Sequence, residues 1–211
     1  IAKQLACESA VLLKNDGILP ISRDADVVVI GALAEQMRFQ GGGSSHINTA
    51  SFPNALDALR KLGVTVTYAP GYSLKDEENR ELEEQALALA AGQKTVLFFG
   101  GLTDQYEGEG YDRESLAMPA NQLHLLNKIC EVSPNVVVVS FSGAPYDMAF
   151  ENRVRGILQM YLGGEAVGEA CGELLTGRVN PSGKLAESWP YAVEDLSLIH
   201  ISEPTRPRLI S

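Results

Sequence analysis

Apolar and polar positions alternate along the chain in two different patterns. Short, continuous apolar runs rich in β-branched residues are typical of strands that are buried on both faces of a parallel sheet. Five runs of this kind lie at 27–30, 64–68, 95–100, 136–140 and 157–161. Between these runs and after the last one, apolar residues recur at helical spacing in 52–62, 76–91, 122–132 and 165–175. This alternation predicts an α/β fold, a three-layer sandwich with a mostly parallel sheet and helices on both faces.

The two ends of the chain differ from this pattern. Residues 2–14 have helical spacing and precede Asn-Asp-Gly at 15–17, which predicts one helix leading into the domain. We therefore expect a helical linker over 1–20 and the domain itself over 21–195. The chain has no initiator Met, so we expect it to begin inside a longer polypeptide. The last segment, 196–211, continues no period and resembles a translated sequencing adapter, so we expect it to be non-native.

Composition narrows the class of protein. The 211 residues carry a formal net charge of −10 and 45% of them are hydrophobic, which is typical of a soluble globular domain. An acidic chain without a basic patch repels nucleic acid, so we expect no such partner. No apolar run approaches membrane-spanning length, so we expect no membrane association. The three cysteines, Cys7, Cys130 and Cys171, are too widely separated to indicate a disulfide framework or a zinc site.

The stretch EGEGYDR at 107–113 carries the strongest sign of chemistry. It follows the third apolar run, where a strand of a parallel sheet ends in a loop. Ligands of open α/β sheets bind beyond the carboxyl ends of the strands, so a Glu in this loop is a candidate proton donor. The alternative is that an acidic loop is solvated surface, as acidic loops of acidic proteins usually are.

A second loop, QGGGSSHIN at 40–48, follows the first strand. Its three successive glycines allow the backbone to approach a ligand closely. Neither GxGxxG nor GxxxxGK[ST] is present, which argues against a nucleotide site. The hydroxyl, imidazole and amide groups that follow suit a neutral polyol such as a sugar, and a glycine-rich surface turn is the alternative. No second His lies at ligand spacing from His46, and no cluster in the chain suggests a metal ion or an organic cofactor.

Two further loops are expected to be structural. SFSGAPYD at 140–147 follows the fourth strand at the same edge of the sheet. The stretch 177–190 is punctuated by Gly, Asn and Pro and is expected to form an ordered turn before a last short strand. Trp189 is expected to pack against the sheet or a partner domain. The absence of GxSxG argues against acyl transfer by a serine triad.

Four blocks in order, SAVLLKNDGILP, GGGSSHIN, GLTDQYEGEGYDRESLAMPANQ and GEAVGEACGELLTGRVNPSGKLAESWP, resemble the C-terminal α/β sandwich domain of glycoside hydrolase family 3 over 1–190. The resemblance implies a two-domain active site for retaining hydrolysis of a β-linked sugar, most simply by a β-glucosidase. A (β/α)8 barrel, which would precede this chain, carries the Asp nucleophile, and the sandwich supplies the acid/base Glu. The fragment is therefore expected to be inactive alone.

The same resemblance assigns roles to particular residues. It implies that Glu109 is the general acid/base, with Glu107 as the second choice. Asp112 and Arg113 are adjacent opposite charges, and by analogy with loop ion pairs we expect them to hold the shape of their loop. One or two residues of the glycine-rich loop are expected to contact the sugar, from Gly42, Gly43, Ser44, Ser45 and His46.

Three alternatives to a β-glucosidase stay open. They are a non-catalytic carbohydrate-binding or interaction module, a β-xylosidase-type member of the same family, and a nucleotide-binding domain, which is the least favoured. The expected partners are a β-linked sugar, the missing barrel and possible homodimer formation with a second copy. A cytoplasmic location and a bacterial source are favoured, whereas the sugar, linkage and aglycone are left open.

Overall fold

The computed structural model describes residues 1–190 apart from 23, 45, 50, 51 and 93. Within this part of the chain, six strands form one sheet in the order β1-β6-β5-β4-β2-β3. Strands β2 to β6 pair in parallel, and β1 pairs antiparallel with β6 at one edge. The strands are β1 (Val11–Asn15), β2 (Asp26–Ile30), β3 (Thr65–Ala69), β4 (Thr95–Gly101), β5 (Val136–Phe141) and β6 (Gly156–Gln159).

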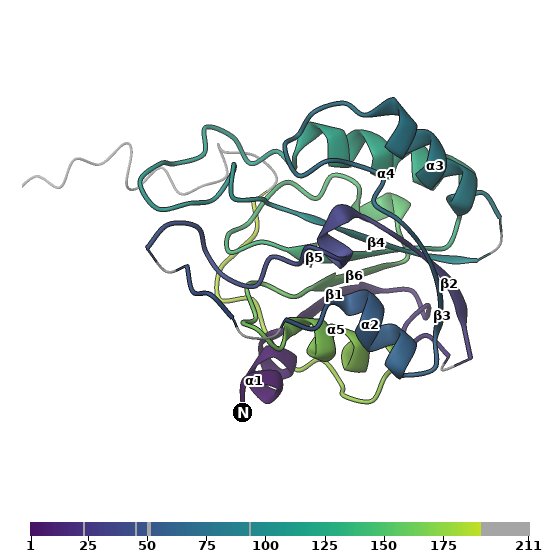
Figure 1. The fold of residues 1–211 in the computed structure, drawn as a ribbon, viewed down its shortest axis with the longest axis horizontal. Coiled ribbons are helices and arrows are strands. Elements are labelled where there is room, and N and C mark those ends of the chain that lie inside the picture. Colours follow the sequence, from purple (N-terminus) through teal and green to yellow (C-terminus); the bar gives the residue numbers. More distant parts are fainter. Residues whose placement is uncertain (23, 45, 50–51, 93, 191–211) are drawn as a thin grey trace, which may run out of the picture.

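Helices cover both faces of the sheet, which gives three layers (Figure 1). Helices α1, α2 and α5 pack on one face, and α3 and α4 pack on the other. Their bounds are α1 (Ala2–Ser9), α2 (Ala55–Lys61), α3 (Arg80–Ala90), α4 (Ala120–Val132) and α5 (Val167–Leu175), with short 3₁₀ helices η1 (Ala32–Ala34) and η2 (Glu151–Arg153). The predicted fold class and the predicted central strands are confirmed.

The central strands are buried because their side chains point alternately into two separate cores. In β2, Val27 and Val29 pack with the layer of α1, α2 and α5, whereas Val28 and Ile30 pack with the layer of α3 and α4. A strand with an apolar layer on each side has no polar face, which is why these runs are continuously apolar in the sequence.

The prediction of a single helix over 2–14 is wrong at its second half. Helix α1 ends at Ser9, Ala10 is extended, and β1 begins at Val11. Leu12 packs against one core and Leu13 against the other, as neighbouring residues of a strand do. The apolar positions of 5–13 fit a helical period by chance, and pairing with β6 decides the structure. Part of the predicted linker over 1–20 therefore belongs to the sheet.

The segment 177–190 contains no strand, and the short strand predicted to follow it lies outside the described residues. The segment runs past the start of β1, where the amide of Gly183 donates to the carbonyl oxygen of Ala10 over 3.1 Å. Pro181 and Pro190 have no N–H group and cannot extend this contact into a ladder. Trp189 packs as expected against the body of the domain, with its ring centroid 5.7 Å from that of Tyr146.

Candidate active site

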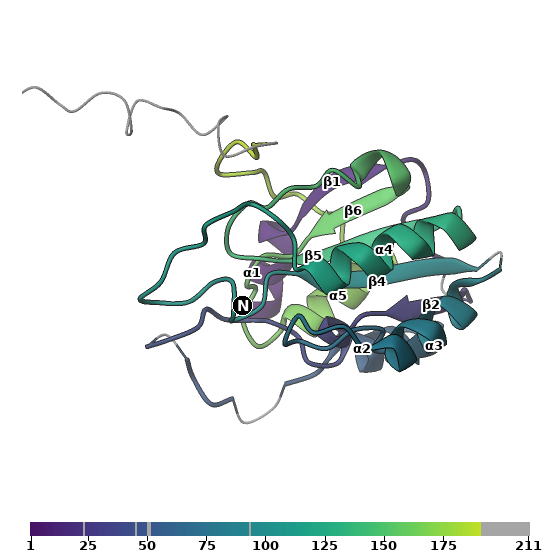
Figure 2. The ribbon, with the colours of Figure 1, turned by 90° about the horizontal axis from the view of Figure 1, so that it is seen from above.

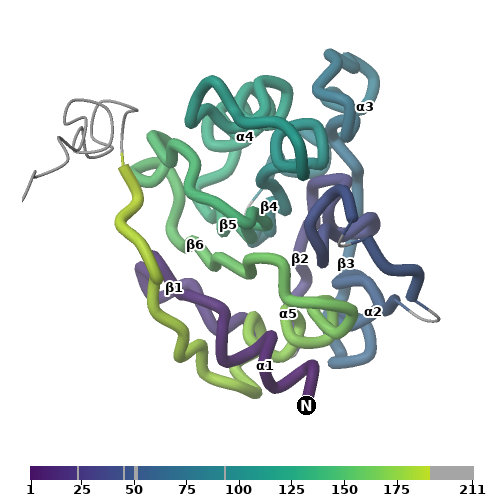
Figure 3. Tube along the Cα trace, turned by 90° about the vertical axis from the view of Figure 1, so that its left-hand side faces the viewer, coloured from purple at the N-terminus to yellow at the C-terminus, as the bar shows by residue number. Residues whose placement is uncertain are grey.

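The two loops singled out by the sequence lie side by side beyond the carboxyl ends of the parallel strands. One is the segment between η1 and α2, and the other is the segment between β4 and α4; both project from the same end of the sheet (Figures 1 and 2). Viewed from that end, β6, β5, β4 and β2 follow one another across the sheet (Figure 3). The loops therefore leave neighbouring strands, and the structure brings the two motifs together as their positions at this edge predict.

The loop after β4 starts from a fixed point. Gly101, the last residue of β4, has φ +138°, and a Cβ atom there would lie 2.0 Å from the carbonyl oxygen of Phe141 on β5. The buried amide of Gln122 on α4 holds this residue from both sides. Its Oε1 accepts from the N–H of Gly101 over 2.8 Å, and its Nε2 donates to the carbonyl oxygen of Gly101 over 3.0 Å. The direction in which the loop leaves the sheet is thus set by the core.

Glu107 points back toward the ends of the strands and is almost fully enclosed, with 14% of its side chain exposed. Its Oε1 accepts from the amide of Ala144 over 2.6 Å, and its Oε2 accepts from the amide of Gly143 over 2.9 Å and from the guanidinium of Arg38. Both carboxylate oxygens are therefore occupied by donors of the protein itself. A carboxylate held in this way anchors a loop and is poorly placed to exchange protons with a ligand.

Glu109, two residues further along, lies at the exposed tip of the same loop. Its Oε2 accepts from the amide of Ser44 over 2.7 Å and from the hydroxyl of Ser44. The side-chain hydrogen bond, followed by the backbone one, lowers the pKa of Glu109 below its ordinary value. This carboxylate is accessible, and it is held in a defined orientation by the neighbouring loop.

Gly43 is required for this contact. It has φ +91°, and a Cβ atom added to it would lie 2.6 Å from Cβ of Glu109 and 2.9 Å from its Oε2. The adjacent Gly42 forms a parallel β-bridge with Gly108. The successive glycines therefore let the glycine-rich loop approach the carboxylate-bearing loop, whereas the close approach to a ligand that the sequence suggests stays a prediction.

The remaining predicted residues are placed as follows. The amide of His46 donates to the carbonyl oxygen of Gly43 over 3.1 Å, and the His46 side chain is exposed. Ser45 lies outside the described residues. Arg113 donates to the carbonyl oxygen of Pro145 over 2.6 Å and so ties its loop to the segment after β5, whereas Asp112 is exposed. None of these contacts tests whether the residues bind a sugar.

A hollow of about 420 Å³ opens beside the loop that carries the two glutamates. Tyr106, Glu107, Tyr111 and Arg113 are among its lining residues. Burial, followed by a hydrogen bond to Asp76, raises the pKa of Tyr106 to about 12, so this phenol stays protonated at neutral pH. Its lining combines aromatic rings with hydroxyl, carboxylate and guanidinium groups, of which those of Tyr106, Glu107 and Arg113 are hydrogen-bonded within the protein.

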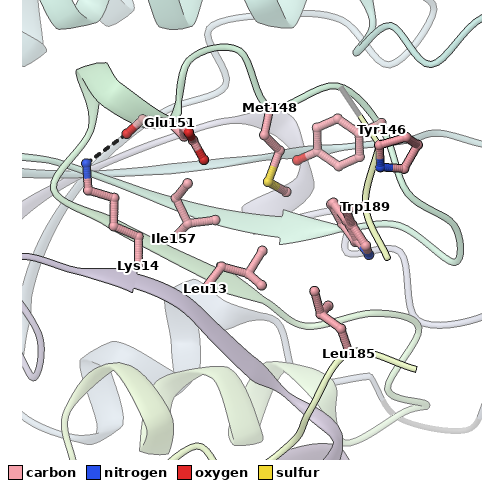
Figure 4. A pocket seen from close by; sticks show the side chains of 9 residues that line it. Leu13, Lys14, Tyr146, Met148, Glu151, Ile157, Leu185 and Trp189 are labelled. Carbon is pink, nitrogen blue, oxygen red and sulfur yellow. Dashed lines mark hydrogen bonds between the residues drawn. The ribbon is translucent and has the colours of Figure 1, made fainter. Parts of the chain in front are cut away.

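A second hollow of about 180 Å³ lies against the outer strands β1 and β6 (Figure 4). Leu13, Met148, Ile157 and Leu185 give it a mainly apolar lining, and the rings of Tyr146 and Trp189 close one side, as Figure 4 shows. None of the described residues that line it belongs to either of the two loops above. This hollow is therefore separate from the candidate site.

Sequence reasoning missed three groups at the site. Arg38 and the amides of Gly143 and Ala144 hold Glu107. The sequence pattern indicates no role for the segment of Arg38, and it indicates a structural role for SFSGAPYD without naming Glu107 as the partner. A lone Arg between Met37 and Phe39, which are both apolar, is the signal that could have indicated a buried charge in need of a partner.

The described part of the chain has neither a cluster of metal-ion ligands nor a membrane-spanning helix. No group of three or more His, Cys, Asp or Glu side chains within it could hold a metal ion. None of its helices has both the length and the apolar character that a membrane crossing requires.

Comparison with known proteins gives consistent matches. A family model described as "Glycosyl hydrolase family 3 C-terminal domain" matches residues 10–207. The chain is 40% identical over 195 residues to thermostable beta-glucosidase B of Acetivibrio thermocellus, which covers 90% of this chain and 26% of that protein. It is 39% identical over 207 residues to an exo-alpha-(1->6)-L-arabinopyranosidase of Bifidobacterium longum, covering 92% of this chain and 27% of that protein.

A solved structure agrees with the sequence matches. The crystal structure of a GH3 beta-glucosidase from Bifidobacterium adolescentis superimposes with a TM-score of 0.87 at 42% identity, covering 92% of this chain and 29% of that one. The chain thus spans about a quarter of the length of the curated relatives it matches.

Proposed function

Because the chain belongs to the C-terminal domain of glycosyl hydrolase family 3, we propose that it supplies the general acid/base of a retaining β-glycosidase, through Glu109. The relatives named above are glycoside hydrolases, and β-glucoside hydrolysis is the simplest activity to expect of the parent protein. The observation that carries the proposal is the contrast between the two glutamates. Glu107 is occupied by protein donors on both oxygens, whereas Glu109 is presented at the tip of the loop.

In a retaining mechanism, one carboxylic acid first donates a proton to the departing glycosidic oxygen and later, as a carboxylate, takes a proton from water. The hydrogen bonds from Ser44 favour the ionised form of Glu109, which is the form that activates water. Proton donation requires the opposite state, with a raised pKa. A second carboxylate nearby, together with exclusion of water by a covering domain, would raise the pKa in the assembled site.

The nucleophile belongs to the part of the parent protein that this chain does not include. In retaining enzymes, the two carboxyl groups lie about 5–5.5 Å apart, so a second domain must approach the tip of the loop after β4. We propose that a (β/α)8 barrel does so and that the hollow beside Tyr106, Tyr111 and Arg113 lies at the junction. The isolated chain then has half of a catalytic pair and no hydrolytic activity.

A domain exchange tests the proposal. Residues 1–190 would replace the matching region of thermostable beta-glucosidase B, and hydrolysis of aryl β-glucosides would be measured for the chimera and for the isolated chain. We expect activity from the chimera alone. In the chimera, Glu109→Ala should slow hydrolysis most for substrates with poor leaving groups, because their departure depends on proton donation. Azide should restore turnover of this variant by attacking the glycosyl-enzyme intermediate.

Variants of the chimera and the activity of the isolated chain distinguish the roles of the two glutamates and the competing functions. If Glu107→Ala gave azide rescue and Glu109→Ala did not, the assignment of the acid/base would be wrong. Activity of the isolated chain would contradict the division of labour. A folded chimera that binds sugars without hydrolysing any of a glucoside, xyloside and arabinopyranoside panel would favour a non-catalytic module.

A further inference from the structure

The two loops at the candidate site are joined at three successive levels. At the base, Arg38 contacts Glu107; further out, Gly42 bridges Gly108; at the tip, Ser44 holds Glu109. The loops run side by side in two perpendicular views (Figures 1 and 2). Only the base of this contact is buried, so it is the only level that the core of the domain can fix.

Arg38 makes the base contact with nearly all of its donors. Its Nε donates to Oδ1 of Asp104 over 3.1 Å, its Nη1 donates to the carbonyl oxygen of Leu102 over 3.3 Å and to the Glu107 carboxylate, and its Nη2 donates to the carbonyl oxygen of Glu107 over 2.9 Å. Only 5% of the Arg38 side chain is exposed. A planar guanidinium with donors in a fixed fork therefore sets both the position and the direction of residues 102–107.

Apolar packing does not set the position of the loop tips. Ile47 on one loop is 61% exposed and Tyr111 on the other is 46% exposed. Residues 43, 44, 109 and 110 are likewise exposed. Segments with few buried apolar contacts open easily, so their arrangement depends on the polar contacts at their base.

We propose that Arg38 is a positioning residue for Glu109, acting through Glu107 to align the carboxylate-bearing loop with the glycine-rich loop. The catalytic meaning of this role rests on the proposed function of Glu109, whereas the alignment itself is a property of this chain. Arg38 touches neither substrate nor the carboxylate of Glu109. It fixes the segment from which Glu109 projects, and it lies six residues before Ser44, the partner that orients the Glu109 carboxylate.

The inference can be tested on the 211-residue chain without any turnover. Two readouts report on the tip of the loops: the pKa of the Glu109 carboxyl from a carbon-13 NMR titration, and hydrogen exchange of the amides of Ser44 and Glu109. In Arg38→Met, we expect the pKa of Glu109 to rise toward its ordinary value, and exchange of these amides to become about tenfold faster as the loops separate.

The matched control is Arg155→Met. Arg155 also donates to a side chain and a backbone carbonyl, over 2.9 Å to Asn135 and 3.0 Å to Asp16, away from the two loops. It should change thermal stability and leave both Glu109 readouts as in the original chain. Arg38→Lys keeps the charge but loses the fork, so it should fold and show an intermediate pKa and exchange rate, which keeps the test valid if Arg38→Met does not fold.

A folded Arg38→Met or Arg38→Lys variant with unchanged Glu109 pKa and unchanged exchange at Ser44 would overturn the inference and leave Arg38 a purely stabilising residue. This outcome is distinct from failure of the proposed function. An inactive, folded domain-exchange chimera would remove the catalytic role of Glu109, and it would leave the NMR result on the isolated chain intact.

Discussion

Neutralising Glu107 should destabilise the domain much more than the same change at Glu109. In Glu107→Gln, one carboxylate oxygen becomes an NH2 group. This group must face either the guanidinium of Arg38 or one of the amides of Gly143 and Ala144, all of which are donors. At least two N–H donors then face each other without an acceptor, in a place where little water can reach them.

The size of the effect follows from the burial of the pair. Removing one partner of a buried ion pair costs about 3–5 kcal/mol. Arg38 keeps Asp104 and two carbonyl oxygens, so the low end, about 3 kcal/mol, applies here. For a chain of this length, each kcal/mol lowers the melting temperature by about 2–4 °C, which gives a fall of about 6–12 °C.

Thermal unfolding followed by circular dichroism at pH 7 measures the difference. Glu109→Gln is the matched control, because it makes the same chemical change two residues away at an exposed tip. Its melting temperature should fall much less than that of Glu107→Gln, because only an exposed hydrogen-bonded contact with Ser44 is weakened. Equal falls for both variants, or no fall for Glu107→Gln, would refute the reasoning that Glu107 is the anchor and Glu109 the free group.

Two further predictions concern the tip of the loop that carries Glu109. Ser44 lowers the pKa of Glu109, so their contact stabilises the folded state at pH values above the unfolded-state pKa, and this stabilisation is lost as the pH falls through the folded-state pKa. In Ser44→Ala, the backbone hydrogen bond is retained, so an NMR titration should show the Glu109 pKa raised only part of the way to its ordinary value. Gly43 and the control position Gly110 have similar φ values, +91° and +93°, so the backbone strain of Ala at either position should lower the free energy of unfolding in urea by about 1–2 kcal/mol. Only Gly43→Ala should also shift the Glu109 pKa, because a Cβ atom at Gly110 meets open space.

The sequence predicted the parts of the fold in which local pattern and tertiary packing agree. The continuous apolar runs of β4 and β5 can be satisfied only with a core on each side, so they identify the sheet directly. The prediction for the segment of β1 was wrong because its apolar residues fit both a helical and a strand period, and only the pairing of β1 with β6 decides between the two. That partner lies more than 140 residues away in the sequence and leaves no local signal.

The candidate site was predictable as far as the sheet edge but not in its internal contacts. Loops that follow parallel strands must emerge on the same side, so the meeting of the two motifs follows from topology. The anchoring amides of Gly143 and Ala144 belong to the backbone, which any residue type supplies. Their role therefore could not be inferred from residue identities in the loop after β5.

Residue type alone does not distinguish the roles of the two glutamates. Glu107 and Glu109 are separated by Gly108 and carry the same functional group, so spacing alone cannot distinguish them. The two residues differ in their surroundings. Glu107 faces several hydrogen-bond donors at the ends of the strands, whereas Glu109 faces the glycine-rich loop, which can approach it closely because Gly43 has no Cβ atom. The exposed carboxylate of Glu109 also depends on the anchor at Glu107, because a group at the tip of a loop can be oriented only if the residues at the base of the loop are held. The burial that keeps Glu107 from exchanging protons with a ligand is thus the same feature that holds Glu109 in its exposed position.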